Sequence, residues 1–312
     1  MADGWGHSPI DTPKDSPLSR QYPPIPCLSR AGEQLQGANL KAQNLRRVDF
    51  TRADLRGASL ESAILIDAHM ADVNLSGACL AHADLTAASL RRANLLGAVL
   101  MAANLEQARL CQAKLAGANL TEAILDGANL VGADLRYAML RRASLAMGNL
   151  NHGQLQYAQA SGAELYGIEG HDTNWEAAHL QKCDFRKASF SQANFDQTNL
   201  TKANLNTAQF IDVSAINVNL RQANLSGALI DRTNLAAANL TEAMMVRTTL
   251  IDTEMTGANL QNSILDKAIC ARWLCQGIIW SRVSVQGTHF HQVKGISQPV
   301  ETWLRSRGAV IT

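Results

Sequence analysis

The sequence predicts an all-β solenoid, a β-helix whose chain turns a corner every five residues. Two observations lead to this prediction. Leu or a similar apolar residue recurs at nearly every fifth position from residue 40 to residue 290, and the phase never slips. The residue two positions before it is small, usually Ala, and Gly is frequent two positions after it. The repeating unit is Ala-(Asn/Asp)-Leu-x-x, in about fifty copies, and such self-similarity is typical of solenoid proteins.

A period of five residues excludes both an α-helix and a flat β-strand. On a helix it would rotate each apolar residue by about 140°, and on a flat strand it would turn alternate Leu residues to opposite faces. The period fits if Ala and Leu point inward from a short extended segment and the next two residues form a β-turn. Four such corners return the chain to its start. Successive coils then stack about 4.8 Å apart and pair their backbone groups.

This pattern resembles the pentapeptide-repeat family over about residues 36–292. The resemblance implies a right-handed quadrilateral β-helix, and about fifty pentads predict about thirteen coils. We expect three parts along the chain: a Pro-rich N-terminal tail at 1–34, the β-helix at 35–292, and a C-terminal capping helix with a tail at 293–312.

The N-terminal tail contains six of the seven prolines within its first thirty residues. Such a segment cannot pair as an inner strand, so it is either disordered or lies across the first coil. A polyproline ligand for a partner domain is a further interpretation. The chain has no signal-peptide segment, no long apolar run and no closely paired cysteines. These features predict a cytoplasmic protein without a membrane span.

The repeat weakens between residues 157 and 198, where Ala160 and Gly170 occupy Leu positions and Trp175 occupies another. We expect this stretch to stay within the coils, with the Trp175 ring filling space that Gly170 leaves. Alternatively, residues 166–175 loop out of the solenoid. A wider core is predicted beyond this point by four aromatic residues in Leu positions, namely Phe185, Phe190, Phe195 and Phe210.

Residues twenty apart should stack on one side of the solenoid. One column alternates in sign, with Asp212, Arg232 and Asp252 in succession, and opposite charges at rung spacing attract each other. Another column predicts an amide ladder and consists of Asn199, Asn219, Asn239 and Asn259. Agreement of both columns with the twenty-residue register supports four sides per coil.

The C-terminal end carries signals for a short helix that closes the core. Ser297 is a candidate N-cap, Pro299 suits the first turn and Gly308 suits the position after the last turn. The apolar side of this helix comprises Val300, Trp303 and Leu304. Residues 270–312 hold five Lys or Arg and one Glu, so this end is basic. We interpret it as a solvated cap, with anion binding as the alternative.

Charge and motif content exclude several classes of function. The chain has 28 Lys and Arg against 27 Asp and Glu, which excludes a generally basic nucleic-acid binder and a generally acidic DNA mimic. His289 and His291 have no further metal ligands nearby in the sequence, so no metal is expected. A narrow core of Leu and Ala leaves no room for a ligand. We therefore expect neither a cofactor nor enzymatic activity.

A candidate protein-binding patch lies near the middle of the chain. Tyr137 and Tyr157 are twenty residues apart and should stack at one corner. Arg136, Arg141 and Arg142 flank them. Tyr and Arg are the residue types that most often anchor protein interfaces. The alternative is a tyrosine ladder that only covers its own corner.

These observations predict a non-enzymatic protein-interaction scaffold or regulator that presents flat faces to a protein partner. The family resemblance supports this prediction, since many members act through protein contacts. The alternative is protection of DNA gyrase, because some members resemble B-form DNA and bind that enzyme. Those relatives are acidic dimers, often with a projecting loop, whereas this chain has a net charge of +1. We expect a monomer closed by its own C-terminal helix, with no direct contact to nucleic acid.

Overall fold

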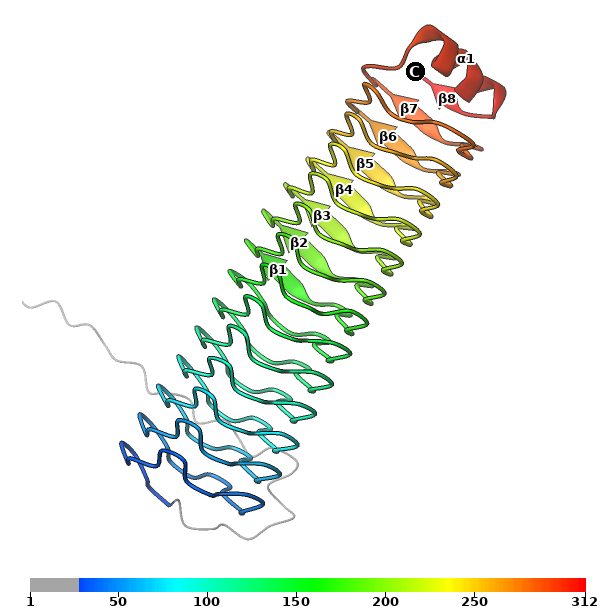
Figure 1. Cartoon of the computed structure of the whole chain (residues 1–312). Helices are drawn as coiled ribbons and strands as arrows, with labels where there is room; N and C mark the ends of the chain where they lie inside the picture. Colours follow the sequence, from blue (N-terminus) through cyan, green and yellow to red (C-terminus); the bar gives the residue numbers. More distant parts are fainter. Residues whose placement is uncertain (1–27) are drawn as a thin grey trace, which may run out of the picture.

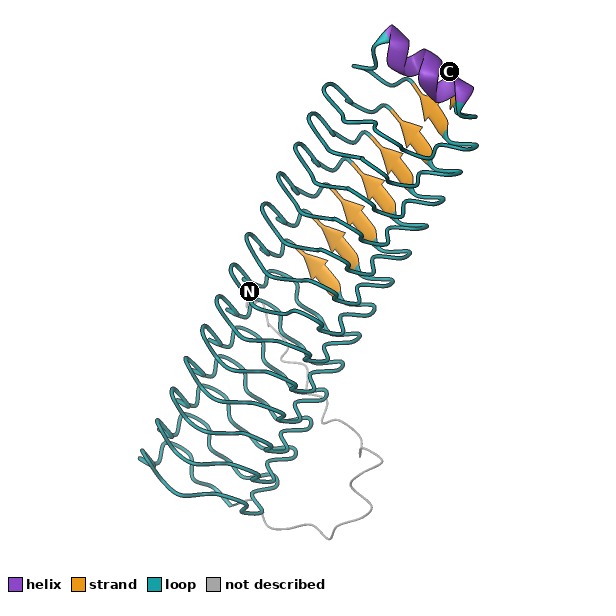
Figure 2. Cartoon of the chain, turned by 45° about the vertical axis from the view of Figure 1, so that its right-hand side comes forward, coloured by secondary structure: helices purple, strands orange, loops and turns teal. Residues whose placement is uncertain are grey.

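The computed structural model describes residues 28–312, which form a parallel β-solenoid with one short helix at its C-terminal end (Figure 1). Seven regular strands lie above one another on one side of the rod, and an eighth follows the helix (Figure 2). The elements are β1 Glu169–His171, β2 Ser189–Ser191, β3 Gln209–Ile211, β4 Leu229–Asp231, β5 Thr249–Ile251, β6 Ile269–Ala271, β7 His289–His291, α1 Gln298–Ser306 and β8 Val310–Ile311.

The rungs of the solenoid pair in parallel at a spacing of twenty residues. β1 to β7 follow this register, as in Phe190 opposite Phe210, and isolated bridges carry the same register along the other sides. One turn has four bridge positions, for example at Asp49, Asp54, Ser59 and Ile64. The four-sided coil expected from the five-residue period is therefore present.

The regular strands make seven turns, so they do not support the predicted count of about thirteen coils. The reason is the short side of each coil. Three residues lie between two turns, and most sides pair through one residue as a bridge rather than as a strand. The first bridges, Ser29–Asp49 and Gln34–Asp54, place residues 29–34 in the solenoid, whereas the sequence assigned them to the tail. The proline-rich part of that tail lies outside the described residues.

The core contains two side chains from each pentad, one small and one large. Ala53 and Leu55 are both almost fully buried, and the same pair recurs through the coils. Each fully buried Leu contributes about 1.5–3 kcal/mol relative to an exposed one. Because the inside of the square is filled in this way, the flat outer sides are the surfaces that remain for binding.

Residues 166–175 stay within the coil, so the loop interpretation is wrong. β1 lies in this stretch and pairs with β2, and Trp175 is fully buried. The side chain that fills the space at Gly170 is Phe190, since a Cβ on Gly170 would lie 2.4 Å from the Phe190 Cδ1 atom. Trp175 instead packs edge-on against the Phe190 ring, with the ring centroids 6.2 Å apart. The expectation that Trp175 fills the gap is corrected accordingly.

The turn residues adopt one backbone conformation whether or not they are Gly. The second turn residue has a positive φ in almost every pentad, as at Gly57 with 62°, Arg52 with 58° and Ala87 with 57°. The sequence suggested this conformation only where Gly is present. The backbone amide of Arg52 donates to the Ala71 carbonyl of the next coil at 2.9 Å, so the turn conformation serves the stacking.

The charged column forms salt bridges as predicted. The Nε atom of Arg232 donates to the Oδ1 atom of Asp212 at 2.6 Å, and Arg272 binds Asp252 in the same way. These arginines hold the pKa of both aspartates below the usual range. The asparagine column behaves differently. The Oδ1 atom of Asn199 accepts from the backbone amide of Thr201 at 3.1 Å, so the side chain caps its own turn rather than its neighbour.

The predicted C-terminal helix is present and lies across the end of the solenoid (Figure 1). Ser297 is its N-cap residue, although its side chain makes no capping hydrogen bond. Leu304 is fully buried against the core, and Gly308 has a φ of 87° just beyond the helix. The sequence did not indicate β8, which pairs with β7 through a hydrogen bond from the Val310 amide to the Thr288 carbonyl at 2.9 Å.

Candidate protein-interaction surface

The exposed tyrosine pair is the most prominent aromatic feature of the solenoid surface. Tyr137 and Tyr157 occupy the second turn position of consecutive coils, each with a φ of 60°. Their rings are parallel within 4° and their centroids lie 5.1 Å apart. The rings remain 59% and 46% exposed. On the N-terminal side the second turn position of the same corner carries no side chain, since it is occupied by Gly57, Gly77, Gly97 and Gly117.

The stack follows from the register of the fold. Equivalent residues of successive coils are about 4.8 Å apart, which is close to the separation of two stacked aromatic rings. Because both tyrosines share the same backbone conformation, their side chains leave the corner in parallel. Each ring covers one face of the other and leaves its outer face and its hydroxyl available to a partner.

The tyrosine pair forms one edge of a flat side of the solenoid, which we call the tyrosine face. Its centre consists of the bridged residues Met139, Gln159 and His179, which point outward. One edge is the corner with Tyr137 and Tyr157, and the opposite edge is the next corner along the chain, at residues 141–142. The face therefore combines two aromatic rings, a thioether and two guanidinium groups.

The arginines differ in their availability. Arg141 donates to the Gln159 side-chain oxygen on the tyrosine face. Arg142 lies 3.5 Å from Glu122, and both side chains are largely exposed. These two arginines line a shallow hollow at their corner, together with Glu122 and Lys182. Both therefore lie along the edge of the tyrosine face.

Arg136 is held on the neighbouring side of the solenoid. Its Nε atom donates to the Oδ1 atom of Asp134 at 2.8 Å, and its second terminal nitrogen binds the other carboxylate oxygen. The guanidinium group holds the pKa of Asp134 below its usual range and raises its own pKa in return. The structure thus brings four of the five predicted residues to one face and sets Arg136 apart.

A second group of large side chains was not predicted. Met147 is 66% exposed at another corner of the same coil, and its Sδ atom covers Gly167 of the next coil. At the same corner Arg186 and Lys187 lie over the Tyr166 ring, 5.7 and 5.5 Å from its centroid. Sorting the turn residues into columns of twenty would have shown that Tyr166 is followed by Arg186 in its own column and by Lys187 beside it.

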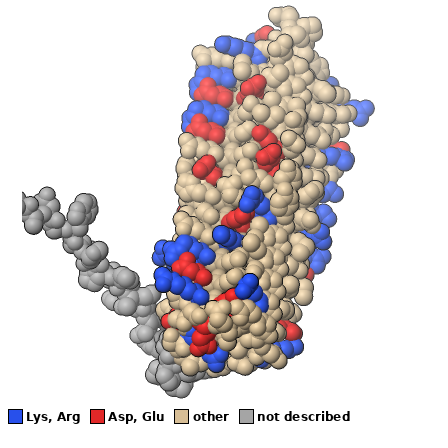
Figure 3. Space-filling view, turned by 60° about the vertical axis from the view of Figure 1, so that its left-hand side comes forward, with Lys and Arg blue, Asp and Glu red and all other residues tan. Residues whose placement is uncertain are grey.

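On the face drawn in Figure 3, charged residues of both signs are intermixed among uncharged ones. Among residues 28–312, no three His, Cys, Asp or Glu side chains are grouped so that they could hold a metal ion. His291 binds the Thr312 hydroxyl through its Nδ1 atom at 2.9 Å. Within the same residues, no helix is long and apolar enough to cross a membrane. The cysteines at 79, 111, 183, 270 and 275 are free thiols.

Comparison with known families and structures yields matches along most of the chain. The model of pentapeptide repeats matches eight copies, at residues 34–70, 68–107, 78–116, 103–142, 113–150 and 233–269. The model of a pentapeptide repeat region matches residues 171–240. A search of curated proteins found no match.

Three solved structures illustrate the similarity. HetL, a pentapeptide repeat protein involved in heterocyst differentiation regulation in the cyanobacterium Nostoc, is 29% identical over 74% of this chain and 86% of its own, with a TM-score of 0.38. QnrB1, a plasmid-mediated fluoroquinolone resistance protein, is 17% identical over 69% and 89%, with a TM-score of 0.26. Rfr23 from the cyanobacterium Cyanothece is 16% identical over 59% and 91%, with a TM-score of 0.15.

Proposed function

Because the chain belongs to the pentapeptide-repeat family, we propose that it is a non-enzymatic scaffold or regulator that binds a protein partner through the tyrosine face. The observation behind this proposal is the exposed, parallel stack of Tyr137 and Tyr157. Two rings fixed by the backbone lose little conformational freedom on binding, and rigid aromatic residues are frequent interface hot spots. Proteins of this family are generally non-enzymatic, in agreement with a core filled by side chains.

The flanking arginines give the tyrosine face its chemical preference. Arg141 and Arg142 are exposed at one edge, and Arg142 has only a solvent-accessible partner in Glu122. An exposed ion pair of this kind contributes little to stability, so a partner carboxylate can replace it at small cost. We therefore propose a partner surface with apolar groups opposite the tyrosines and acidic groups opposite the arginines.

Protection of DNA gyrase through DNA mimicry is less well supported. DNA presents a continuous negative surface, whereas one charged corner of this solenoid alternates in sign. Arg92 binds Asp72 there with two hydrogen bonds of 2.7 Å, and Arg232 and Arg272 repeat the arrangement further along. We propose that the protein acts as a monomer in the cytoplasm, which suits free thiols and a C-terminal end covered by α1.

The proposal is tested by affinity capture from the native host, with the double variant Tyr137→Ala/Tyr157→Ala as comparison. Its matched control is Gln197→Ala/Asn217→Ala, which changes two exposed residues at the same corner of later coils. We expect a specific protein to be retained by the unchanged protein and the control, and lost with the tyrosine variant. Equal retention by all three proteins would show that the tyrosine face is not the interface.

A further inference from the structure

The C-terminal end of the solenoid is only partly closed. β8 covers β7, and the Gly287 amide donates to the Gly308 carbonyl at 2.9 Å. Within residues 28–312, no further rung lies over residues 283–285 on the adjacent side. Among the described residues, the amides of Arg282 and Val285 and the carbonyl of Val283 make no hydrogen bond. These groups form an open ladder edge.

The coil below shows what such an edge binds. There the Leu265 amide donates to the Ser284 carbonyl at 2.8 Å, and the Ser284 amide donates to the Ser263 carbonyl at 3.0 Å. The turn amide of Asn262 adds a third bond, to the Ser281 carbonyl at 2.9 Å. Val285, Val283 and Arg282 present the same three groups one rung higher, without a strand to receive them.

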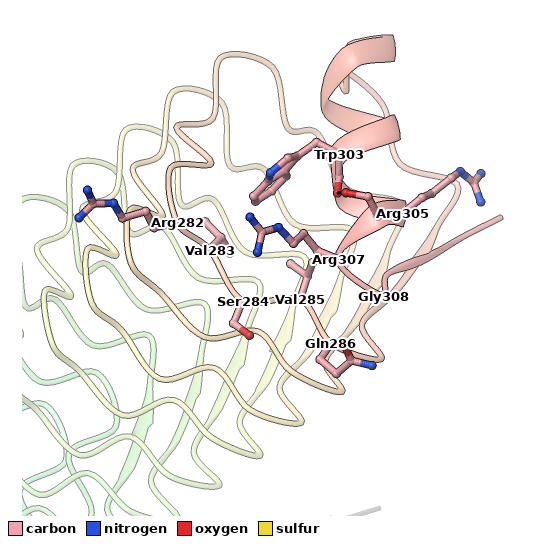
Figure 4. Close-up of a pocket in the computed structure, with 10 residues that line it drawn as sticks. Arg282, Val283, Ser284, Val285, Gln286, Trp303, Arg305, Arg307 and Gly308 are labelled. Carbon is pink, nitrogen blue, oxygen red and sulfur yellow. Dashed lines mark hydrogen bonds between the residues drawn. The ribbon is translucent and has the colours of Figure 1, made fainter.

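A hollow lies over this edge and provides the space for a strand. It has a volume of about 830 Å³ and is lined by residues 282–286 of the last coil and by the C-terminal half of α1 with the residues that follow it (Figure 4). Val283 and Val285 lie at the base of the hollow, and their side chains are themselves almost fully buried in the core. Trp303 stands over the hollow, and the Arg307 guanidinium extends beneath it, 5.8 Å from the ring centroid.

The charge at the hollow is positive. Within residues 28–312, neither Arg282 nor Arg307 forms an ion pair, whereas Arg305 is bound to Glu301 at 2.8 Å. The nearby carboxylate is Asp266, one coil below, and it accepts hydrogen bonds from the Ser284 hydroxyl and the Gln286 amide. Arg307 therefore holds a guanidinium group without an ion pair inside the hollow, and Arg282 holds a second one at the rim, pointing away from Trp303 (Figure 4).

We propose that this hollow binds an extended, acidic peptide segment of a protein partner, which adds in parallel as one further rung over residues 283–285. The peptide carbonyls accept from the amides of Val285 and Arg282, and one peptide amide donates to the Val283 carbonyl. Its aliphatic side chains face Trp303, and its carboxylates face Arg307, with Arg282 at the rim. Such strand addition combines backbone bonds for affinity with side chains for specificity. The site is separate from the tyrosine face.

The test is a binding titration by fluorescence anisotropy with the full-length protein and a labelled, end-blocked peptide of alternating Val and Glu. We expect saturable binding that weakens about tenfold for Arg307→Gln, the effect of losing one charge-assisted hydrogen bond, and less for Arg282→Gln, whose side chain lies at the rim. Arg109→Gln, an exposed arginine on a distant coil, is the matched control and should bind normally. Tyr137→Ala/Tyr157→Ala should also bind normally, which keeps this result independent of the proposed function.

Two peptide variants separate strand addition from simple charge attraction, and they leave the protein unchanged. N-methylation of the central peptide amide should abolish binding, because it removes the donor to the Val283 carbonyl. Replacement of Glu by Lys should abolish it through charge. Absence of binding, or binding that tolerates N-methylation, would overturn the proposal. Binding that occurs only after deletion of residues 1–27 would assign the edge to that segment, and self-association lost in Arg307→Gln would assign it to a second copy.

Discussion

The second turn residue of each pentad is held in the left-handed region of backbone space. Ala237 is an example, with a φ of 53°, and its amide donates to the Thr256 carbonyl of the next coil at 2.8 Å. A side chain in this conformation costs roughly 1–2 kcal/mol relative to Gly. The inter-coil hydrogen bond offsets this cost, so residues other than Gly are tolerated at the corners.

This balance predicts opposite effects for two substitutions at one corner. Ala237→Gly should raise the free energy of unfolding by up to about 1 kcal/mol, because relief of strain exceeds the added entropy of the unfolded chain. Ala237→Val should lower it, since β-branched residues avoid this conformation. Urea denaturation measures both. Ala238→Gly, at the buried neighbour, is the control and should destabilise; an increase there would show that the corner strain is not the cause.

Gly170 is a different case, because it is required for space rather than for backbone conformation. Its missing side chain makes room for the Phe190 ring. Gly170→Ala should therefore lower the free energy of unfolding by about 1–3 kcal/mol through overpacking. Thermal denaturation gives the change. The double variant Gly170→Ala/Phe190→Leu should recover part of the loss, whereas additive losses would contradict the packing explanation.

Among the elements, the C-terminal cap protects both the core and the ladder. Leu304 of α1 is fully buried over the last coil. Arg305 binds Glu301, and its terminal nitrogen also donates to the Ile311 carbonyl of β8 at 2.9 Å. One edge group of β8 is thereby occupied, and unpaired edges are the usual route to unwanted strand addition. Among the described residues, the edge that faces the hollow is one part of the last coil that the cap leaves open.

The cap predicts where unfolding begins when it is weakened. Leu304→Ala should destabilise the C-terminal coils by about 2–5 kcal/mol, because a buried side chain is removed and a cavity remains. Hydrogen exchange should show faster amide exchange in β6 and β7, with little change near residue 100, since each coil contacts only its neighbours. Uniform acceleration along the whole chain would show that the solenoid unfolds as one unit instead.

The sequence predicted the repeating part of the fold well, and it predicted the structure of the C-terminal end and of the candidate site less completely. A strict five-residue phase is enough to fix which residues point inward, and residues twenty apart reveal the Tyr137–Tyr157 stack. β8 was missed because Val310 and Ile311 are a two-residue strand outside the repeat. The sequence did not indicate that the Phe190 ring fills the space beside Gly170, because the orientation of a ring depends on its packing against the neighbouring coil. The Arg136 side chain points towards Asp134 and donates a hydrogen bond to it, and the periodicity of the sequence does not specify this side-chain orientation.

At the scale of the whole molecule, the aspartates that pair with arginines make the free energy of unfolding depend on pH. The pKa of Asp54 is lowered to about 2 by its hydrogen bonds to Arg56, and the pKa values of Asp72, Asp212 and Asp252 are lowered by arginines of the next coil. A carboxylate with a lowered pKa in the folded state contributes stability above its ordinary pKa of about 4 and loses it as pH falls.

The melting temperature should accordingly be constant from neutral pH to about pH 5 and fall between about pH 4 and pH 2. Differential scanning calorimetry across this range measures the change. Because these side chains are exposed, high salt should reduce the dependence. The variant Asp212→Asn/Asp252→Asn should show a shallower fall than the unchanged protein. An identical pH profile in that variant would contradict a role for the charged column.

The twenty-residue register also fixes distances along the axis of the solenoid. Any two surface features on one corner are separated by a whole number of steps of about 4.8 Å, and removal of twenty residues shortens the rod by one step without rotating it. From the coil of Met147 to that of Gly287 there are seven such steps, or roughly 34 Å. A partner that contacts both the tyrosine face and the open end would therefore measure a fixed length, set by the number of pentads between them.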